Sequence, residues 1–332
     1  MAGNESKQFH HLALPLIHRG RAKLHGGGQP SKQTEDNLKN RKGHSTFLKG
    51  KTAAFVDLWQ KNIKLREEED LPPLPKGVPL LLEIDPNADI DYLRSTFGFE
   101  IVSEHDDGFV IVASQDIDFK QFLEKIDGFA DAAWGTGNTA KIHNLYADDS
   151  QVERLKRILS DDLFASWGDI NNETEYIVDV GIECLGTIIM STPVERKDNE
   201  NENSFNRRLN TYMNKVDQAY IAWDELRMDR ENSIEDFVYG YNGEILSYID
   251  GENLGYSHLP DSFTARIKVK GKCVRDLAYN FPFLFEITQP EVLHEVKNSS
   301  QENDVQDIEF EITPPDDDNP YVCDRQWYPR RT

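Results

Sequence analysis

The run Val78-Pro79-Leu80-Leu81-Leu82-Glu83-Ile84 is short and almost continuously apolar, which is typical of a strand buried in a sheet. The apolar spacing then changes, because Ile90, Leu93 and Phe97 recur at intervals of three and four residues. That spacing predicts a short helix. Gly98 suits the end of this helix, since glycine adopts the left-handed backbone conformation without strain. The chain therefore alternates strand and helix at this point, as mixed α and β folds do.

The same unit continues with a hairpin, a second helix and a closing strand. Asp107-Gly108 is a strong hairpin-turn signal between two apolar runs, and Asp118 can cap the helix that follows them. The expected elements are strands at 99–103, 109–113 and 141–146 and a helix at 119–126. The order β-α-β-β-α-β is typical of the split-βαβ, ferredoxin-like sandwich. We therefore expect a first ferredoxin-like domain at residues 78–150.

A longer copy of this order follows at residues 151–290. The expected elements are strands at 175–184, 263–269 and 283–287, a long helix at 205–226 and a short helix at 274–278. Apolar residues keep helical spacing along the long helix, and we expect this series to be core. Residues 263–269 alternate between apolar and polar side chains, as a half-exposed strand does. The predicted fold class is α+β, with two tandem ferredoxin-like sandwiches.

The first 77 residues are expected to form a basic arm and an amphipathic helix. The apolar stretch at 8–18 contains a proline, which favours an extended arm or edge strand, and residues 19–43 are expected to be loop. Helical spacing begins at His44 and runs to about Glu69, where a proline-rich segment ends it.

Composition bounds the function. The chain has 332 residues and a net charge of -22, which argues against a general nucleic-acid or anionic-membrane binder. Residues 1–51 nevertheless carry ten lysines and arginines against three acids. The simplest interpretation of this arm is a segment that docks on the acidic body, and RNA binding is a weaker one. Three scattered cysteines do not make a disulfide framework or a zinc site. With no signal-like apolar core, we expect a cytoplasmic protein.

The end of the chain departs from these patterns. Residues 291–311 resemble a flexible tether, and an acidic proline-rich stretch then leads into a short apolar strand at 321–323. The last nine residues, DRQWYPRRT, continue neither strand nor helix. One allowed codon spelling of them, shifted by one base, translates as I-D-S-G-I-Q-E-E, which restores the strand and adds Asp-Ser-Gly. We therefore expect a frameshift at this point and a mobile acidic tail at residues 291–332.

Three segments together carry a family resemblance. They are Leu12-Ala13-Leu14-Pro15, the region from Gly77 to Ile126, and the junction Pro314-Pro315-Asp316-Asp317-Asp318. In these the chain resembles the non-catalytic N-terminal region of the subtilisin-like serine peptidases that bacteria often encode beside an AAA-type ATPase. The resemblance implies that a subtilisin-type domain with an Asp, His and Ser triad would come next. No triad position of that family lies in this chain, so we expect truncation before the catalytic domain.

These observations predict an accessory role. The first hypothesis is a propeptide-like or regulatory region of a subtilisin-like serine endopeptidase, inactive by itself and docked on the catalytic domain. The second is a partner-binding platform for the associated ATPase, and the third is a nucleic-acid or anion-binding module that acts through the basic arm. No residue is assigned a catalytic, cofactor-binding or metal-binding role.

Overall fold

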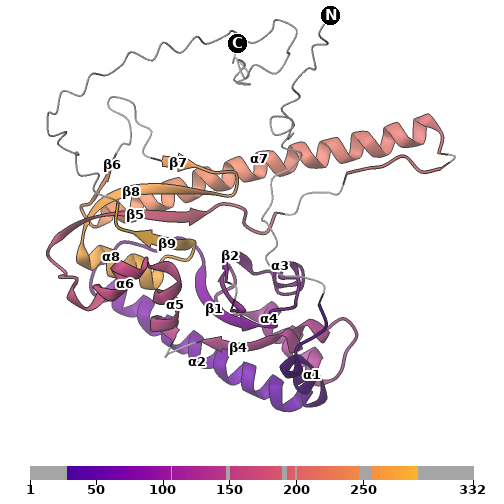
Figure 1. Cartoon of the computed structure of the whole chain (residues 1–332), viewed down its shortest axis with the longest axis horizontal. Helices are drawn as coiled ribbons and strands as arrows, with labels where there is room; N and C mark the ends of the chain where they lie inside the picture. The colour runs from indigo at the N-terminus through magenta and orange to yellow at the C-terminus, as the bar shows by residue number, and fades with distance from the viewer. Residues whose placement is uncertain are drawn as a thin grey trace, which may run out of the picture. The chain divides into compact units, whose positions relative to one another are not determined.

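Two antiparallel sheets organise the part of the chain that the structure describes (Figure 1). The structure is a computed structural model, and it describes residues 28–105, 107–146, 150–188, 193–198, 200–246 and 256–290. The apolar stretch at 8–18, most of the basic arm, the acidic tether and the strand at 321–323 lie outside these residues. The fold class is α+β, as the strand and helix patterns predicted.

The first sheet has the ferredoxin-like topology. Its elements are β1 (Val78–Ile84), α3 (Asp91–Phe97), β2 (Glu100–Glu104), β3 (Phe109–Ser114), α4 (Lys120–Ala130) and β4 (Ile142–Tyr146). The strand order is β2-β3-β1-β4, and all neighbouring strands are antiparallel. This is the arrangement that a split βαβ produces when each crossover leaves room for one strand. The predicted order and nature of these elements are therefore confirmed.

The second sheet repeats this topology with one interruption. Its strands are β5 (Glu175–Glu183), β6 (Glu244–Leu246), β7 (Tyr256–His258), β8 (Ser262–Lys270) and β9 (Leu284–Thr288). The order is β6-β8-β5-β9, and β7 also pairs with β8. Because β6 and β7 pair with successive parts of β8, they share one edge position. The long helix α7 (Glu202–Gly240) and α8 (Gly271–Asn280) supply the two crossovers. Neither β6 nor β7 was predicted, because each has only three residues.

Two turns behave as their sequences predict, and one cap does not. Gly98 ends α3 with φ of 70°, and Gly108 has φ of 83° in the hairpin loop. Asp118 was expected to cap α4, but the carboxylate of Asp116 accepts the hydrogen bond from the Lys120 N–H at 2.6 Å. Phe119 in between takes a left-handed conformation, so the chain turns sharply and Asp116 reaches the helix start.

The segment expected to be loop at 19–43 contains a helix, α1 (Lys32–Lys39). Ser31 caps it by accepting a hydrogen bond from the Thr34 N–H. Asn40 then caps the next helix, α2 (Arg41–Glu68), through the Gly43 N–H. Sequence reasoning missed α1 because it has a single buried residue, Thr34, and therefore lacks an apolar period. The predicted helix at 44–69 is confirmed as α2.

Two large apolar cores and one small cluster hold the described residues together. The first lies between α2, α3, α4 and the helix-covered face of the first sheet. The second contains the helix-covered face of the second sheet, and it also takes in four residues from the opposite face of the first sheet, Leu81, Val102, Ile111 and Ala113. The outer face of the first sheet is therefore buried by the chain itself.

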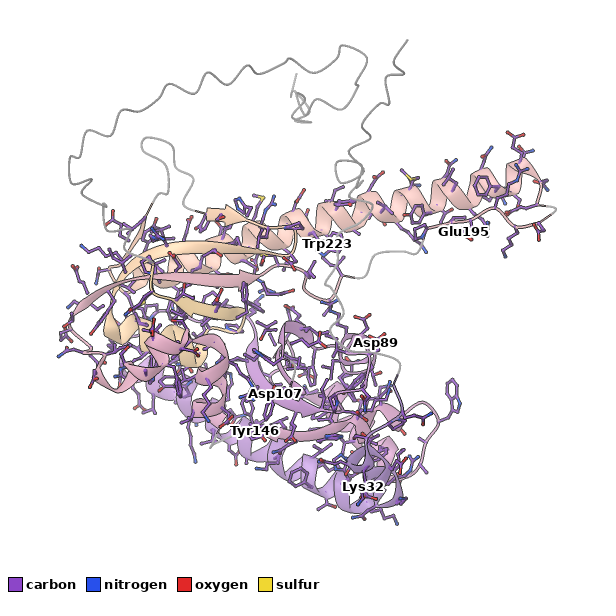
Figure 2. The ribbon with its side chains drawn as sticks, in the orientation of Figure 1. Lys32, Asp89, Asp107, Tyr146, Glu195 and Trp223 are labelled. Atoms are coloured by element: carbon purple, nitrogen blue, oxygen red, sulfur yellow. The ribbon has the colours of Figure 1, made fainter. Side chains whose placement is uncertain are left out.

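The helix α7 is longer than predicted, and its first half is not core. From Ala219 onward it carries buried residues, including Trp223 and Phe237, but no residue between 202 and 218 is buried. Met213 is 47 % exposed. Figure 1 shows this half extending past the strands, and Figure 2 places Trp223 near the point where it leaves them. Helical spacing is the same whether a helix faces a core or solvent, so the spacing alone could not separate the two halves.

Candidate functional site

A buried group of hydroxyl, imidazole and carboxylate side chains lies where α1 meets the first sheet. The Thr34 Oγ1 donates to Asp85 at 2.6 Å and lies 3.0 Å from the Nε2 of His143. Ser31 Oγ is 3.4 Å from the same nitrogen. Because the single Thr34 proton goes to Asp85, Nε2 of His143 must be the donor in the second contact. These are the residue types of a hydrolytic triad, so their geometry decides whether they can act as one.

The arrangement does not match a nucleophile, a base and an orienting carboxylate. In a triad the carboxylate holds the imidazole and the other imidazole nitrogen accepts the nucleophile's proton. Here Asp85 holds Thr34 and the Ser31 N–H, and Nε2 carries a proton toward the hydroxyl. Burial lowers the pKa of His143, although Asp85 and Glu83 oppose this effect. The group therefore caps α1 and anchors it to the sheet.

A second buried group joins the two sheets. Arg230 of α7 donates to Glu100 of β2 at 2.8 Å, and their side chains are 2 % and 3 % exposed. Gln115 also donates to Glu100, at 2.6 Å. The Arg230 guanidinium lies over the ring of Phe283, which precedes β9. Burial lowers the pKa of Arg230, and Glu100 and Glu183 counteract this. This network fixes the junction between the sheets and offers no open reactive atom.

A cavity of about 280 Å³ with several charged residues in its lining lies between α2 and α8. Its cations are already engaged: Arg66 pairs with Asp276, Lys272 lies 3.5 Å from Glu69, and Arg275 donates to two backbone carbonyls. Tyr241 donates to Asp276 at 2.6 Å, and burial, followed by this hydrogen bond, raises the Tyr241 pKa. Because these charged side chains are already paired, they join α2 to the second sheet. A charged ligand would have to break these pairs in order to bind in the cavity.

The outer face of the second sheet is the best candidate for a binding surface. Ile177 of β5 is 44 % exposed there. Across the strands Arg266 makes a bidentate pair with Asp179 at 2.7 and 2.8 Å, and Lys268 lies 3.1 Å from Glu175. Other residues at outward positions in the register are Glu244, Leu246, Ser257, Thr264 and Thr288. The alternation predicted at 263–269 is confirmed, and it was the signal for this face.

The outer face also carries a close contact between a glycine and an aromatic ring. Gly181 in β5 lies against the ring of Phe285, and a Cβ atom at Gly181 would come within 3.0 Å of three of its ring carbons. The glycine therefore lets the aromatic ring lie across the sheet. Five strands support the face, and exposed apolar and paired charged groups alternate over it. A surface of this kind can bind a folded protein whose shape and charge are complementary to it.

The described residues were compared with two further kinds of feature, a membrane-spanning helix and a cluster of metal ligands. Among the helices that the structure describes, none is both long and apolar enough to cross a bilayer. In the same residues no three His, Cys, Asp or Glu side chains gather as metal ligands would. In the described part of the basic segment, Lys49 pairs with Asp127, and Arg41 lies 4.8 Å from the centre of the Phe129 ring. Part of that segment thus packs on the body.

Comparisons with known protein families, with curated proteins and with solved structures found no match. The resemblance to the N-terminal region of subtilisin-like peptidases therefore stays a prediction from the quoted motifs.

Proposed function

We propose that this chain is a propeptide-like or regulatory module of a subtilisin-like serine endopeptidase and that it docks through the outer face of its second sheet. The observation that carries the proposal is the difference between the two sheets. The first sheet buries its outer face in the molecule's own core, whereas the second leaves Ile177, Arg266 and Lys268 accessible. A ferredoxin-like module that binds by its sheet therefore has one face available.

Docking rather than catalysis also fits the chemistry of the described residues. Among the described residues, the group around His143 and Asp85 has the residue types of a triad, and it is committed to capping a helix. The charged pairs on the second sheet are partly exposed, so a partner can exchange or extend them at low cost. Contact with an apolar patch on a protease domain would also remove Ile177 from water.

The test mixes the purified chain with a separately expressed subtilisin-type catalytic domain. Expected results are inhibition of peptide hydrolysis and a higher refolding yield of the catalytic domain. An Ile177→Asp variant should lose at least tenfold in inhibition, because it places a charge in the apolar centre of the contact. Ile117→Asp is the matched control, since Ile117 is 52 % exposed away from this face. Equal loss in both variants, or no binding at micromolar concentration, would refute the proposal.

A second candidate function is a platform for the associated AAA-type ATPase, and the first half of α7 favours it. This half carries no buried residue between 202 and 218, and Arg208 ties the adjoining segment to it through the backbone oxygen of Glu195 at 2.6 Å. Figure 2 shows Glu195 beside the extended part of the helix. A Met213→Asp variant should then lose ATPase binding while protease inhibition is unchanged. The nucleic-acid alternative rests on the basic arm, most of which lies outside the described residues.

A further inference from the structure

The helix α1 is attached to the rest of the molecule almost entirely through polar contacts. Thr34 is its only buried residue, and none of the residues 32–39, all of which the structure describes, belongs to an apolar core or to the small cluster. The helix α2, by contrast, contributes Leu48, Phe55 and Trp59 to the first core. Elements with few buried apolar contacts open more readily than the rest of a protein. We therefore expect α1 to separate from the body more easily than α2.

Two side chains of the first domain hold α1 in place. The Asp85 carboxylate, which follows β1, accepts hydrogen bonds from the Ser31 N–H at 2.9 Å and from the Thr34 hydroxyl at 2.6 Å. The Nε2–H of His143, in β4, donates to the same hydroxyl over 3.0 Å. Thr34 thus links a carboxylate to a titratable imidazole, and these contacts form the main attachment of α1.

The junction between α1 and α2 is suited to act as a hinge. Only Asn40 separates the two helices (Figure 1). Its side chain caps α2 through the Gly43 N–H, so α2 can keep its cap when α1 moves. Asn37 adds a hydrogen bond to the carbonyl of Ala140 at 2.9 Å, and a neutral bond of this kind contributes little to stability. Release of the contacts to Asp85 and His143 would therefore free α1 and leave α2 in place.

His143 makes this attachment sensitive to acid. The charged and titratable groups that act on His143 are the carboxylates of Asp85 and Glu83 and the imidazole of His44. Burial lowers the pKa of His143 below its ordinary value of about 6.5, and it outweighs the two carboxylates, which raise the pKa. Without α1, Nε2 of His143 would meet water, and the burial that lowers its pKa would be relieved. The open form then binds a proton at a higher pH than the closed form, so a falling pH favours the open form.

We propose that α1 is a strap that closes over Asp85 and His143 at neutral pH and opens in mild acid, while α2 and both sheets stay folded. One additional proton is bound on opening, so the equilibrium constant for opening rises by up to about tenfold for each pH unit below about 6.5. Burial raises the pKa of Asp85, but its hydrogen bonds outweigh burial and lower the pKa, so Asp85 stays ionised in this range. The strap lies on the first sheet, and its opening is separable from docking through the second.

The first experiment measures hydrogen–deuterium exchange of the full chain by mass spectrometry at pH 7.5 and pH 5.5. Peptides that cover 32–39 and 48–59 report on α1 and α2, and their rates are corrected for the pH dependence of amide exchange itself. The expected result is that α1 exchanges much faster than α2 at both pH values, and that its protection falls about tenfold at the lower pH. Equal rates in the two helices, or protection of α1 that does not change with pH, would overturn the proposal.

A substitution in α1 tests the contacts that close the strap. Thr34→Val keeps the shape of the side chain and removes the hydroxyl that links Asp85 to His143. At pH 7.5 the α1 peptide should then exchange roughly tenfold faster or more, while the α2 peptide stays protected. Thr46→Val is the matched control, because Thr46 is exposed on α2 and its hydroxyl donates to a carbonyl of the same helix. Equal exchange of α1 in the two variants would refute the role of Thr34.

A second substitution separates proton binding from packing. The amide of His143→Gln can donate to Thr34 as the imidazole does, but it does not titrate. The α1 peptide of this variant should therefore lose its tenfold response to acid. His258→Gln is the control, because His258 lies in β7 of the second sheet, and its α1 peptide should respond as the unchanged chain does. An acid response that survives in His143→Gln, or one that disappears in His258→Gln, would show that another group controls α1 and would overturn the proposal.

Discussion

The ion pair between Arg230 and Glu100 is the contact whose removal should damage the fold most. Both side chains are almost fully buried, at 2 % and 3 % exposure, and they join α7 to the first sheet. Replacing Glu100 with Gln removes the carboxylate that accepts the hydrogen bond of the Arg230 guanidinium and leaves Glu183 to offset the burial of this charge. Removing one partner of a buried pair costs about 3–5 kcal/mol, because the other charge stays desolvated. Against a total of about 5–15 kcal/mol for a domain, this loss is large.

The assay is urea unfolding followed by circular dichroism at pH 7. With a slope of about 2 kcal/mol per molar urea, a loss of 3–5 kcal/mol lowers the midpoint by about 1.5–2.5 M. Arg230→Met should lose a similar amount, because it leaves the Glu100 carboxylate buried with only Gln115 as a donor among the contacts described above. The double variant should lose much less than the sum of the two singles, since neither charge is then left alone.

A control and a refuting result complete this prediction. The pair between Lys268 and Glu175 has side chains 40 % and 62 % exposed, so Lys268→Met should change stability by less than about 1 kcal/mol. If Glu100→Gln also cost less than this, or if the two single losses added without coupling, the junction would not depend on the ion pair. The reasoning that one buried network joins the two sheets would then be wrong.

Two other predictions concern pH and packing. Burial lowers the pKa of His44 and of His143 below the ordinary value of about 6.5, so each stays neutral in the fold where the unfolded chain already binds a proton. Stability should be highest above pH about 6.5 and fall as pH drops toward the folded pKa values; a flat urea midpoint between pH 7.5 and 5 would contradict this. Gly181→Ala should destabilise the second sheet by about 1–3 kcal/mol, because the new methyl group would strike Phe285. Gly168→Ala has open space and should be neutral in the same thermal unfolding measurement, and equal behaviour of the two would refute the packing argument.

The order of strands and helices could be predicted from the sequence because each element carries its own local pattern. The run at 78–84 is apolar except for Glu83 because β1 lies inside its sheet, and residues 263–269 alternate because β8 has one face outward. Gly98 and Gly108 adopt the positive φ that their turn positions require. These patterns were sufficient for the first ferredoxin-like topology, since a β-α-β-β-α-β order with short connections leaves few ways to close an antiparallel sheet. In the second sheet the edge strands β6 and β7 are too short to carry such a pattern.

Which face of each sheet and helix is buried was decided by tertiary structure alone. The two outer sheet faces differ because Arg230 and the residues around Phe283 cover the first sheet and nothing described covers Ile177 on the second. Helical spacing is equally regular along α7, yet only its second half meets a core. A local pattern reports which side of an element is apolar, but burial depends on residues far away in the chain. The candidate docking face could therefore be located only once the two sheets had been placed side by side.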